Sequence, residues 1–159
     1  MTPHTVTLRD IHDSDLPIFF EMQRDPDARH MAAFTAADPN DREAFMAHWA
    51  KNRANPSNLY RTILVDGQVA GYVVSFVWEG KRDVGYWLDK THWGKGIATQ
   101  ALAQFLQIET ERPMNAMVVH DNLGSLRVLQ KCGFKITGEG RAFANARGEE
   151  IDEVYLTLE

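Results

Sequence analysis

Alternating hydrophobic and polar positions in the middle of the chain predict three consecutive strands. Residues 60–65, 69–76 and 83–88 are rich in Val, Ile, Tyr and Phe, which favour extended structure. Asp66-Gly67 separates the first two runs and is a strong hairpin signal, and a second Gly-containing turn precedes the third run. The pattern therefore predicts an antiparallel meander, which follows a short first strand over residues 6–9.

Two helices are expected between the first strand and the meander. The first spans about residues 15–24 and follows Asp13 or Ser14, whose side chains cap helix N-termini well. Residues 29–38 contain apolar and aromatic side chains without a firm period, so they predict no element. The second helix is expected to start with Asp38 as its N-cap and a proline at its first position. Proline-containing turns end both helices.

The second half of the chain alternates helices with strands. A Gly-rich turn over residues 91–99 connects the last strand of the meander to a helix that ends near Glu109. A strand, a helix and a further strand in succession imply a parallel crossover connection. The remaining elements are a strand over 114–119, a helix over 122–131 and strands over 134–138 and 152–158. These elements predict one α/β domain over residues 1–159, with a mixed twisted sheet of about seven strands and helices on both faces.

Composition and charge narrow the classes of function. The 159 residues are 44% hydrophobic, carry a net charge of −5 and include one cysteine, Cys132. The acidic balance argues against general nucleic-acid binding, and one cysteine supports neither an intramolecular disulfide nor a cysteine-based metal site. No apolar run approaches the ~20 residues that span a bilayer, and the N-terminus lacks a signal-peptide pattern. We expect a cytoplasmic enzyme or binding protein without a metal, nucleic-acid or membrane partner.

The Gly-rich turn carries the strongest candidate chemistry. The helix that follows it begins with N–H groups that have no partner inside the helix, which makes an anion site. Gly94 and Gly96 remove Cβ atoms that would hinder a ligand, and Lys95 adds a positive charge. The spacing fits neither a P-loop nor a dinucleotide fingerprint, since Thr99 stands where the third glycine belongs. The alternatives are a phosphate or pyrophosphate cradle, a nucleotide-phosphate binder, and a ligand-free connection.

Two segments resemble the signatures of the GCN5-related N-acetyltransferase (GNAT) superfamily. Residues 93–98, Trp-Gly-Lys-Gly-Ile-Ala, are similar to the acetyl-CoA motif Gln/Arg-x-x-Gly-x-Gly/Ala, with Trp93 in place of Gln or Arg. The run from Asn122 to Phe134 resembles the second signature, Asn-x-x-Ser/Ala…Gly-Phe. One helix and one strand separate the two segments, as in the family. The resemblance is closest to the branch that contains ribosomal-protein N-terminal-alanine acetyltransferases.

This resemblance implies acetyl-CoA as a co-substrate. In the family, two parallel strands, here 84–89 and 116–119, splay apart and admit the pantetheine arm, and the pyrophosphate lies on the Gly-rich turn. Asn122 resembles the residue that hydrogen-bonds the arm, and it also suits a helix N-cap. The coenzyme-binding residues implied are Leu88, Asp89, Trp93, Gly94, Lys95, Gly96, Ile97, Ala98, Thr99, Asn122 and Ser125.

The catalytic groups are less clearly marked. Many family members have a Tyr acid seven residues after the Asn, where this chain has Leu129, and several have a Glu where it has Met117. Ser125 and His120 are the remaining candidates, Ser125 as a proton donor to the leaving thiolate and His120 as a base. Cys132 lies on the last turn of a helix, where the dipole disfavours a thiolate, so we expect a structural role for it.

The expected function is transfer of the acetyl group from acetyl-CoA to a primary amine by direct attack in a ternary complex. The amine would belong to a small molecule or to a protein N-terminus, and a homodimer is compatible with the family. The alternative is a non-catalytic acyl-CoA-binding sensor, which the missing Tyr and Glu favour. Aromatic residues considered for an acceptor pocket or for the core are Phe34, Trp49, Tyr72, Tyr86 and Trp87.

Overall fold

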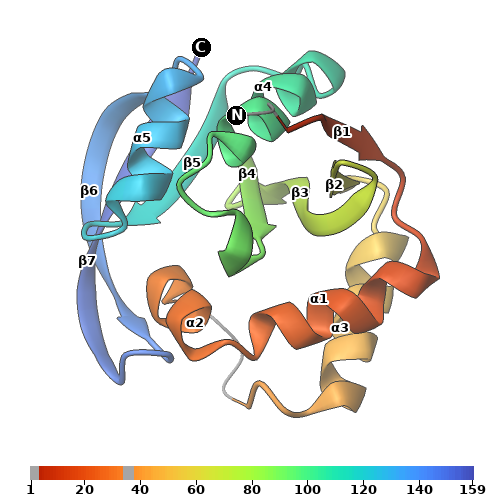
Figure 1. Ribbon diagram of the computed structural model, residues 1–159. Helices are drawn as coiled ribbons and strands as arrows, with labels where there is room; N and C mark the ends of the chain where they lie inside the picture. The colour runs from red at the N-terminus through yellow and green to blue at the C-terminus, as the bar shows by residue number, and fades with distance from the viewer. Residues whose placement is uncertain (1–3, 34–37) are drawn as a thin grey trace.

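Seven strands form one mixed sheet in a computed structural model that describes residues 4–33 and 38–159. The strand order across the sheet is β1-β2-β3-β4-β5-β7-β6 (Figure 1). The strands are β1 (Val6–Arg9), β2 (Leu59–Val65), β3 (Gln68–Trp78), β4 (Lys81–Leu88), β5 (Met114–Val119), β6 (Lys135–Ala144) and β7 (Glu149–Leu158). The predicted α/β class with a mixed sheet is confirmed, and so is the antiparallel meander of β2, β3 and β4.

Helices cover both faces of the sheet, as the sequence predicts. Tyr72 of β3 packs in a cluster with Phe19 and Trp49 from the N-terminal helices. Its neighbour Val73 faces the opposite way, because strand residues alternate, and packs in the main core. The helices are α1 (Leu16–Gln23), α2 (Pro26–Ala32), α3 (Arg42–Ala54), α4 (Ile97–Ile108) and α5 (Leu123–Lys131), with the short 3₁₀ helices η1 (Asp13–Asp15) and η2 (Lys90–His92).

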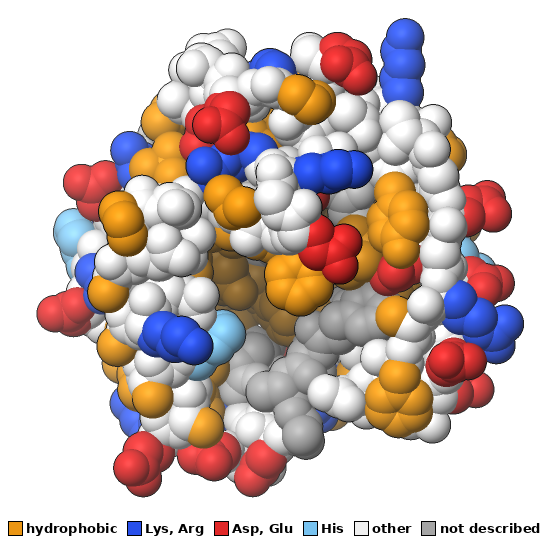
Figure 2. Space-filling model, turned by 180° about the vertical axis from the view of Figure 1, so that it is seen from behind, with side chains coloured by type: hydrophobic (Ala, Val, Ile, Leu, Met, Phe, Trp, Pro, Cys, Tyr) orange, Lys and Arg blue, Asp and Glu red, His pale blue; other side chains and the backbone are white. Residues whose placement is uncertain are grey.

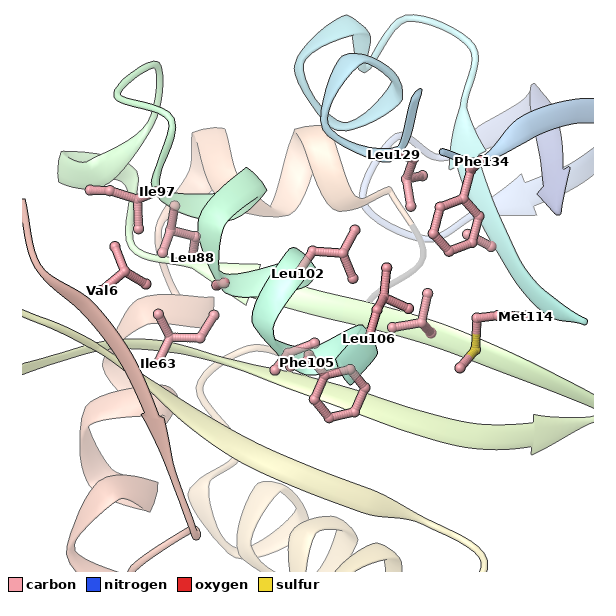
Figure 3. Packing of buried hydrophobic residues seen from close by; sticks show 14 of the residues in the cluster. Val6, Ile63, Leu88, Ile97, Leu102, Phe105, Leu106, Met114, Leu129 and Phe134 are labelled. Carbon is pink, nitrogen blue, oxygen red and sulfur yellow. The ribbon is translucent and has the colours of Figure 1, made fainter. Parts of the chain in front are cut away.

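The main core lies between the sheet and α4. Ile97 and Phe105 of α4 are fully buried and pack in one cluster with Val6 of β1 and Ile63 of β2 (Figure 3). Leu88, the last residue of β4, belongs to the same cluster. Burial of apolar side chains this large is the main favourable term in folding. The packing therefore holds the N-terminus of α4 in a defined position beside the end of β4.

The strands β4 and β5 are parallel and meet only near their beginnings. Their pairing consists of Asp83 opposite Asn115, whereas β5 and β7 pair along the whole length of β5. Beyond this pair, β4 diverges from β5 and ends at Leu88. The crossover through α4 that the sequence predicts and the splayed pair of parallel strands that the family resemblance implies are both present.

Helix α2 is an element that the hydrophobic pattern does not predict. The turn at residues 25–27 ends the first helix as expected, but it also starts the next one. The Asp25 carboxylate accepts a hydrogen bond from the Ala28 N–H at 2.9 Å, and Pro26 occupies the first helical position. An acidic cap followed by proline is a helix start, and the helix covers part of the stretch 29–38, for which the hydrophobic pattern gives no clear prediction.

Other element boundaries also differ from the predictions. The N-cap of α3 is Asp41, whose carboxylate accepts from the Ala44 N–H at 3.0 Å, so the prediction of Asp38 as this cap is wrong. Asp38 instead accepts from the Asn40 N–H within a turn. Strand β6 continues to Ala144, well beyond the predicted end, because each of its residues from Gly138 onward pairs with β7.

Candidate active site

A cavity of about 370 Å³ opens beside the C-terminal end of β4. Helix α2, the Gly-rich turn with the N-terminus of α4, and one side of α5 form its other walls. The lining residues are Ala28, Met31, Ala32, Tyr86, Trp87, Leu88, His92, Trp93, Gly94, Gly96, Ile97, Ala98, Thr99, Asn122, Gly124, Ser125, Arg127, Val128 and Lys131. Nine of the eleven residues implied for coenzyme binding are therefore brought together here, and Asp89 and Lys95 are outside this lining.

The N-terminus of α4 presents free backbone donors to this cavity. Gln100 makes the first intrahelical bond, to the Gly96 carbonyl oxygen at 3.2 Å, so the N–H groups of residues 97–99 precede any intrahelical acceptor. Gly96 is the N-cap in the left-handed region, at φ 77°, and a Cβ built on it or on Gly94 would meet no atom within 4 Å. The open space, the free N–H groups and the positive end of the helix dipole suit an anionic ligand.

The backbone at the end of β4 already has hydrogen-bond partners within the protein. The Trp93 indole N–H donates to the Leu88 carbonyl oxygen at 2.9 Å, which ties the Gly-rich turn to the strand. The Asp89 N–H donates to the Ala70 carbonyl oxygen at 2.8 Å, and the Asp89 carboxylate caps η2 by accepting from the Thr91 N–H. The Leu88 carbonyl keeps a second lone pair for a ligand, but the Asp89 N–H is engaged.

Asn122 connects α5 to α2 at the edge of the cavity. Its Oδ1 accepts from the Ser125 N–H at 3.2 Å and makes Asn122 the N-cap of α5. Its Nδ2 donates to the Met31 carbonyl oxygen at 3.3 Å. The cap role expected from the sequence is therefore present, and the same side chain lines the cavity.

Two hydroxyl groups from distant parts of the chain meet inside the cavity. The Tyr86 hydroxyl of β4 and the Ser125 Oγ of α5 are 2.6 Å apart. Burial raises the pKa of Tyr86, although the hydrogen bond with Ser125 acts against this. The phenol therefore remains protonated at neutral pH and the pair can donate a hydrogen bond or a proton to a neighbouring group.

The other candidates from the sequence lie elsewhere. His120 is exposed at the end of β5, outside the cavity lining, and its Nδ1 is 3.1 Å from the Asp152 carbonyl oxygen. Cys132 directs its Sγ to the Thr99 carbonyl oxygen at 3.6 Å, and burial raises the pKa of its thiol. A thiol with a raised pKa is a poor nucleophile, which agrees with a structural role for Cys132.

The aromatic candidates divide between the core and the cavity. Trp49 and Tyr72 pack edge to face with ring centroids 4.8 Å apart, in the cluster beneath α1 and α3. Tyr86 and Trp87 line the cavity. Phe34 lies outside the described residues.

Sequence reasoning missed the cationic side of the cavity. Arg127 and Lys131 are four residues apart on α5, so they lie on one helix face, and both line the cavity. This spacing was visible within the predicted helix and could have marked them. His92 also lines the cavity, and its buried Nδ1 has no hydrogen-bond partner within the described part of the chain.

Across residues 4–33 and 38–159, no helix is long and apolar enough to cross a membrane. Within the same residues, no three His, Cys, Asp or Glu side chains are grouped as a metal site would require.

A mixed sheet with a splayed pair of parallel strands, and a cavity beside it at a helix N-terminus, define this protein as an α/β domain with a ligand-sized cavity. The model of the acetyltransferase (GNAT) domain matches residues 5–135 of this chain. The chain therefore belongs to the GNAT acetyltransferase family, as its two signature segments predict.

Relatives and solved structures agree with this assignment. Probable N-acetyltransferase YjcK of Bacillus subtilis is 39% identical over 80 residues, which are 47% of this chain and 44% of YjcK, less than half of that protein. The structure of Mycobacterium smegmatis RimJ in complex with CoA-disulfide is 25% identical, with a TM-score of 0.80 over 96% of this chain and 81% of RimJ. Ribosomal-protein-alanine N-acetyltransferase from Brucella melitensis has the same fold, with 21% identity and a TM-score of 0.78 over 96% of this chain and 98% of its own.

Proposed function

We propose that this protein is an N-acetyltransferase that moves the acetyl group of acetyl-CoA to a primary amine by direct attack. One observation carries the proposal: a single cavity contains both the free N–H groups at the start of α4 and the Tyr86–Ser125 hydroxyl pair. The N–H groups can bind the anionic pyrophosphate of the coenzyme, and the hydroxyl pair can donate to its sulfur. The structure of RimJ with CoA-disulfide supports coenzyme A as the ligand.

The residues around the cavity provide a role for each part of the donor. In this proposal the N–H groups of residues 97–99 bind the pyrophosphate, with space left by Gly94 and Gly96. The amides of the pantetheine arm lie along β4 at Leu88, and the Asn122 side chain binds the arm from the other side. Arg127 and Lys131, on the outer part of α5, face the 3′-phosphate of the adenosine.

Charge reversal at Lys131 tests the assignment of the 3′-phosphate. Lys131→Glu is expected to weaken CoA binding about tenfold and dephospho-CoA binding about twofold or less, because an exposed charge acts mainly on the nearest phosphate. Calorimetric titration with both ligands at low salt measures the difference. Lys135→Glu, an exposed change on β6 outside the cavity, is the matched control. An equal loss of affinity for CoA and for dephospho-CoA would refute the assignment of Lys131 to the 3′-phosphate.

The hydroxyl pair has a direct use in the reaction. The amine nitrogen attacks the carbonyl carbon, the C–S bond breaks, and the sulfur leaves as a thiolate that must gain a proton. Ser125 and Tyr86 can supply that proton or a strong hydrogen bond. This pair would take the place of the Tyr that many relatives have where this chain has Leu129.

Removal of either hydroxyl is expected to slow the chemical step. Ser125→Ala and Tyr86→Phe should each lower kcat by about 10- to 100-fold. This is at or below the lower end of the roughly 10²- to 10⁴-fold that a general acid or base usually contributes to the rate. The Kd of acetyl-CoA should stay within about twofold, because Phe keeps the ring that packs in the core. Thiol release under saturating amine measures kcat. Wild-type kcat in both variants would exclude the pair from proton transfer.

A panel of amines tests the proposed function itself. The panel contains free amino acids, polyamines and short peptides with N-terminal Ala or Ser, since the Brucella melitensis relative is a ribosomal-protein-alanine N-acetyltransferase. We expect release of the CoA thiol together with a mass increase of one acetyl group on at least one amine. Tight acetyl-CoA binding without acetylation of any amine would instead support the non-catalytic sensor.

A further inference from the structure

Strand β7 contains a buried carboxylate that the fold does not fully satisfy. Glu153 is 5% exposed, and its Oε1 accepts a hydrogen bond from the Tyr155 hydroxyl at 2.5 Å. Its Oε2 is buried and has no hydrogen-bond partner within residues 4–33 and 38–159. Burying a carboxylate oxygen without a hydrogen-bond partner destabilises the folded state. A group that binds Oε2 would offset this cost.

The arrangement around Glu153 leaves room for its hydroxyl partner. Gly140 of β6 is opposite Glu153, and a Cβ built on Gly140 would lie 2.1 Å from the Tyr155 hydroxyl oxygen. Any side chain at position 140 would therefore displace the Tyr155 ring or its hydroxyl. Glycine at this position allows the Tyr155–Glu153 hydrogen bond to form, with Oε2 left for another group.

Strand pairing places Glu153 on the face of the sheet opposite α5. Leu156 of β7 packs in the main core, and alternation directs residues 151, 153 and 155 to the other face. On that face Ile151 packs with Val119 of β5 and with Ala33 at the end of α2. Figure 2 shows the molecule from behind, with a hollow that has hydrophobic side chains at its floor and acidic side chains beside it.

The same pairing places Glu153 next to the open end of the splayed strands. Glu153 is opposite Val119, the last residue of β5, while β4 and β5 meet only at Asp83 and Asn115 near their beginnings. Because β7 is the neighbour of β5 on the side away from β4, Glu153 is one strand away from the open end of the gap between β4 and β5. The cavity with the hydroxyl pair is lined by residues of β4, α5 and α2, and α2 is the helix whose end packs against Ile151 on the face of Glu153.

We propose that the Glu153 carboxylate binds the ammonium group of the acceptor and takes its first proton. This inference rests on the proposed function. A primary amine is largely protonated at neutral pH, and Glu153 Oε2 accepts one proton from R–NH3⁺ to leave neutral R–NH2. The nitrogen then forms its bond to the acetyl carbon, the C–S bond breaks, and the second amine proton ends on the CoA sulfur through the Ser125–Tyr86 pair. Glu153 returns its proton to water.

This assignment also explains a departure from the family pattern. Met117 stands where several relatives have a Glu, and it is opposite Tyr155 on the same face as Glu153. The carboxylate of this chain would then be supplied by β7, the strand adjacent to β5. Met117 is diagonal to Glu153, whose own partner is Val119. Diagonal neighbours on one face lie about 7–8 Å apart, so long side chains at the two positions can reach the same region.

The test uses Glu153→Gln, which keeps the size of the side chain and an oxygen for the Tyr155 hydroxyl. We expect kcat/KM for the best amine of the panel to fall at least about 100-fold, with the Kd of acetyl-CoA within about twofold by tryptophan fluorescence. Glu139→Gln, an exposed carboxylate next to Gly140 on β6, is the control and should keep wild-type kinetics. A kcat/KM within about threefold of wild type in Glu153→Gln would overturn the inference.

A rescue variant separates chemistry from structural support. Met117 is 49% exposed, so Met117→Glu adds a carboxylate to the same face without opening a core cavity. The double variant Met117→Glu/Glu153→Gln should have a kcat/KM at least about tenfold above that of Glu153→Gln alone. A purely structural role of Glu153 predicts no such increase. If circular dichroism shows that Glu153→Gln does not fold, Glu153→Asp replaces it, because Asp is shorter and withdraws the carboxylate. Its kcat/KM should be at least about tenfold below that of the wild type. A wild-type kcat/KM in Glu153→Asp would contradict the inference. Wild-type protein that acetylates no amine would refute the proposed function instead.

Discussion

Gly96→Glu is expected to weaken acetyl-CoA binding at least about 100-fold, equivalent to roughly 2.7 kcal/mol. Gly96 is the N-cap of α4 and lies in the left-handed region at φ 77°. A Cβ built here meets no atom within 4 Å, so a side chain has room beside the free N–H groups of residues 97–99. The carboxylate would occupy the anion cradle, satisfy its donors and repel the pyrophosphate. Calorimetric titration of the variant with acetyl-CoA measures the loss.

A glycine in the same conformation elsewhere provides the control for backbone strain. Gly80, between β3 and β4, has φ 76°, and a Cβ built there also meets no atom within 4 Å. Gly80→Glu therefore introduces the same left-handed strain, of about 1–2 kcal/mol, and the same charge at a distance from the cavity. It should keep the wild-type Kd. If Gly96→Glu binds acetyl-CoA as wild type does, the pyrophosphate is not held at this turn.

Asp15→Asn is expected to lower the free energy of unfolding by about 3 kcal/mol, as the loss of one partner does in other buried ion pairs. The Asp15 side chain is 2% exposed and accepts from Arg9 Nη1 at 2.7 Å. It also accepts from the His12 N–H at 2.9 Å and the Thr62 hydroxyl at 2.7 Å. These bonds fix the start of α1 against β1 and β2. Urea unfolding at neutral pH measures the effect.

The same carboxylate predicts how stability depends on pH. Burial by itself raises the pKa of Asp15, but hydrogen bonds from Arg9, His12 and Thr62 outweigh it and lower the pKa to about 2. The resulting stabilisation, about 2 kcal/mol, is present above the pKa of the unfolded chain near 3.8. It is lost as pH falls toward 2.

Asp13→Asn is the control, because Asp13 is 94% exposed in its pair with Arg53. Exposed pairs contribute about 0–1 kcal/mol. Equal unfolding free energies for the two variants between pH 2 and 7 would contradict the role given to Asp15.

Features that depend on neighbours in sequence could be predicted. Asp66-Gly67 set the β2–β3 hairpin, and the strand, Gly-rich turn and helix around Gly96 were placed correctly. The segment after Asn122 predicted α5 and its cap. Each of these follows from backbone conformation or capping within a few residues, and together with the family signatures they located most of the cavity.

Features that depend on pairing between distant segments could not be predicted. The Tyr86–Ser125 contact requires β4 and α5 to meet across the cavity, and nothing local to either residue indicates it. Glu153 has the position used in the proposal only because β7 inserts between β5 and β6. Helix α2 was missed for a different reason, since Asp25-Pro26 ends one helix and starts the next.

Calorimetric titration of the wild-type protein with acetyl-CoA, and with CoA, ATP and NAD as competitors, tests the central claim most directly. The cavity between the end of β4, α5 and the N-terminus of α4 predicts one acetyl-CoA per chain, displaced by CoA and unaffected by ATP or NAD. Binding of ATP or NAD without binding of acetyl-CoA would contradict it.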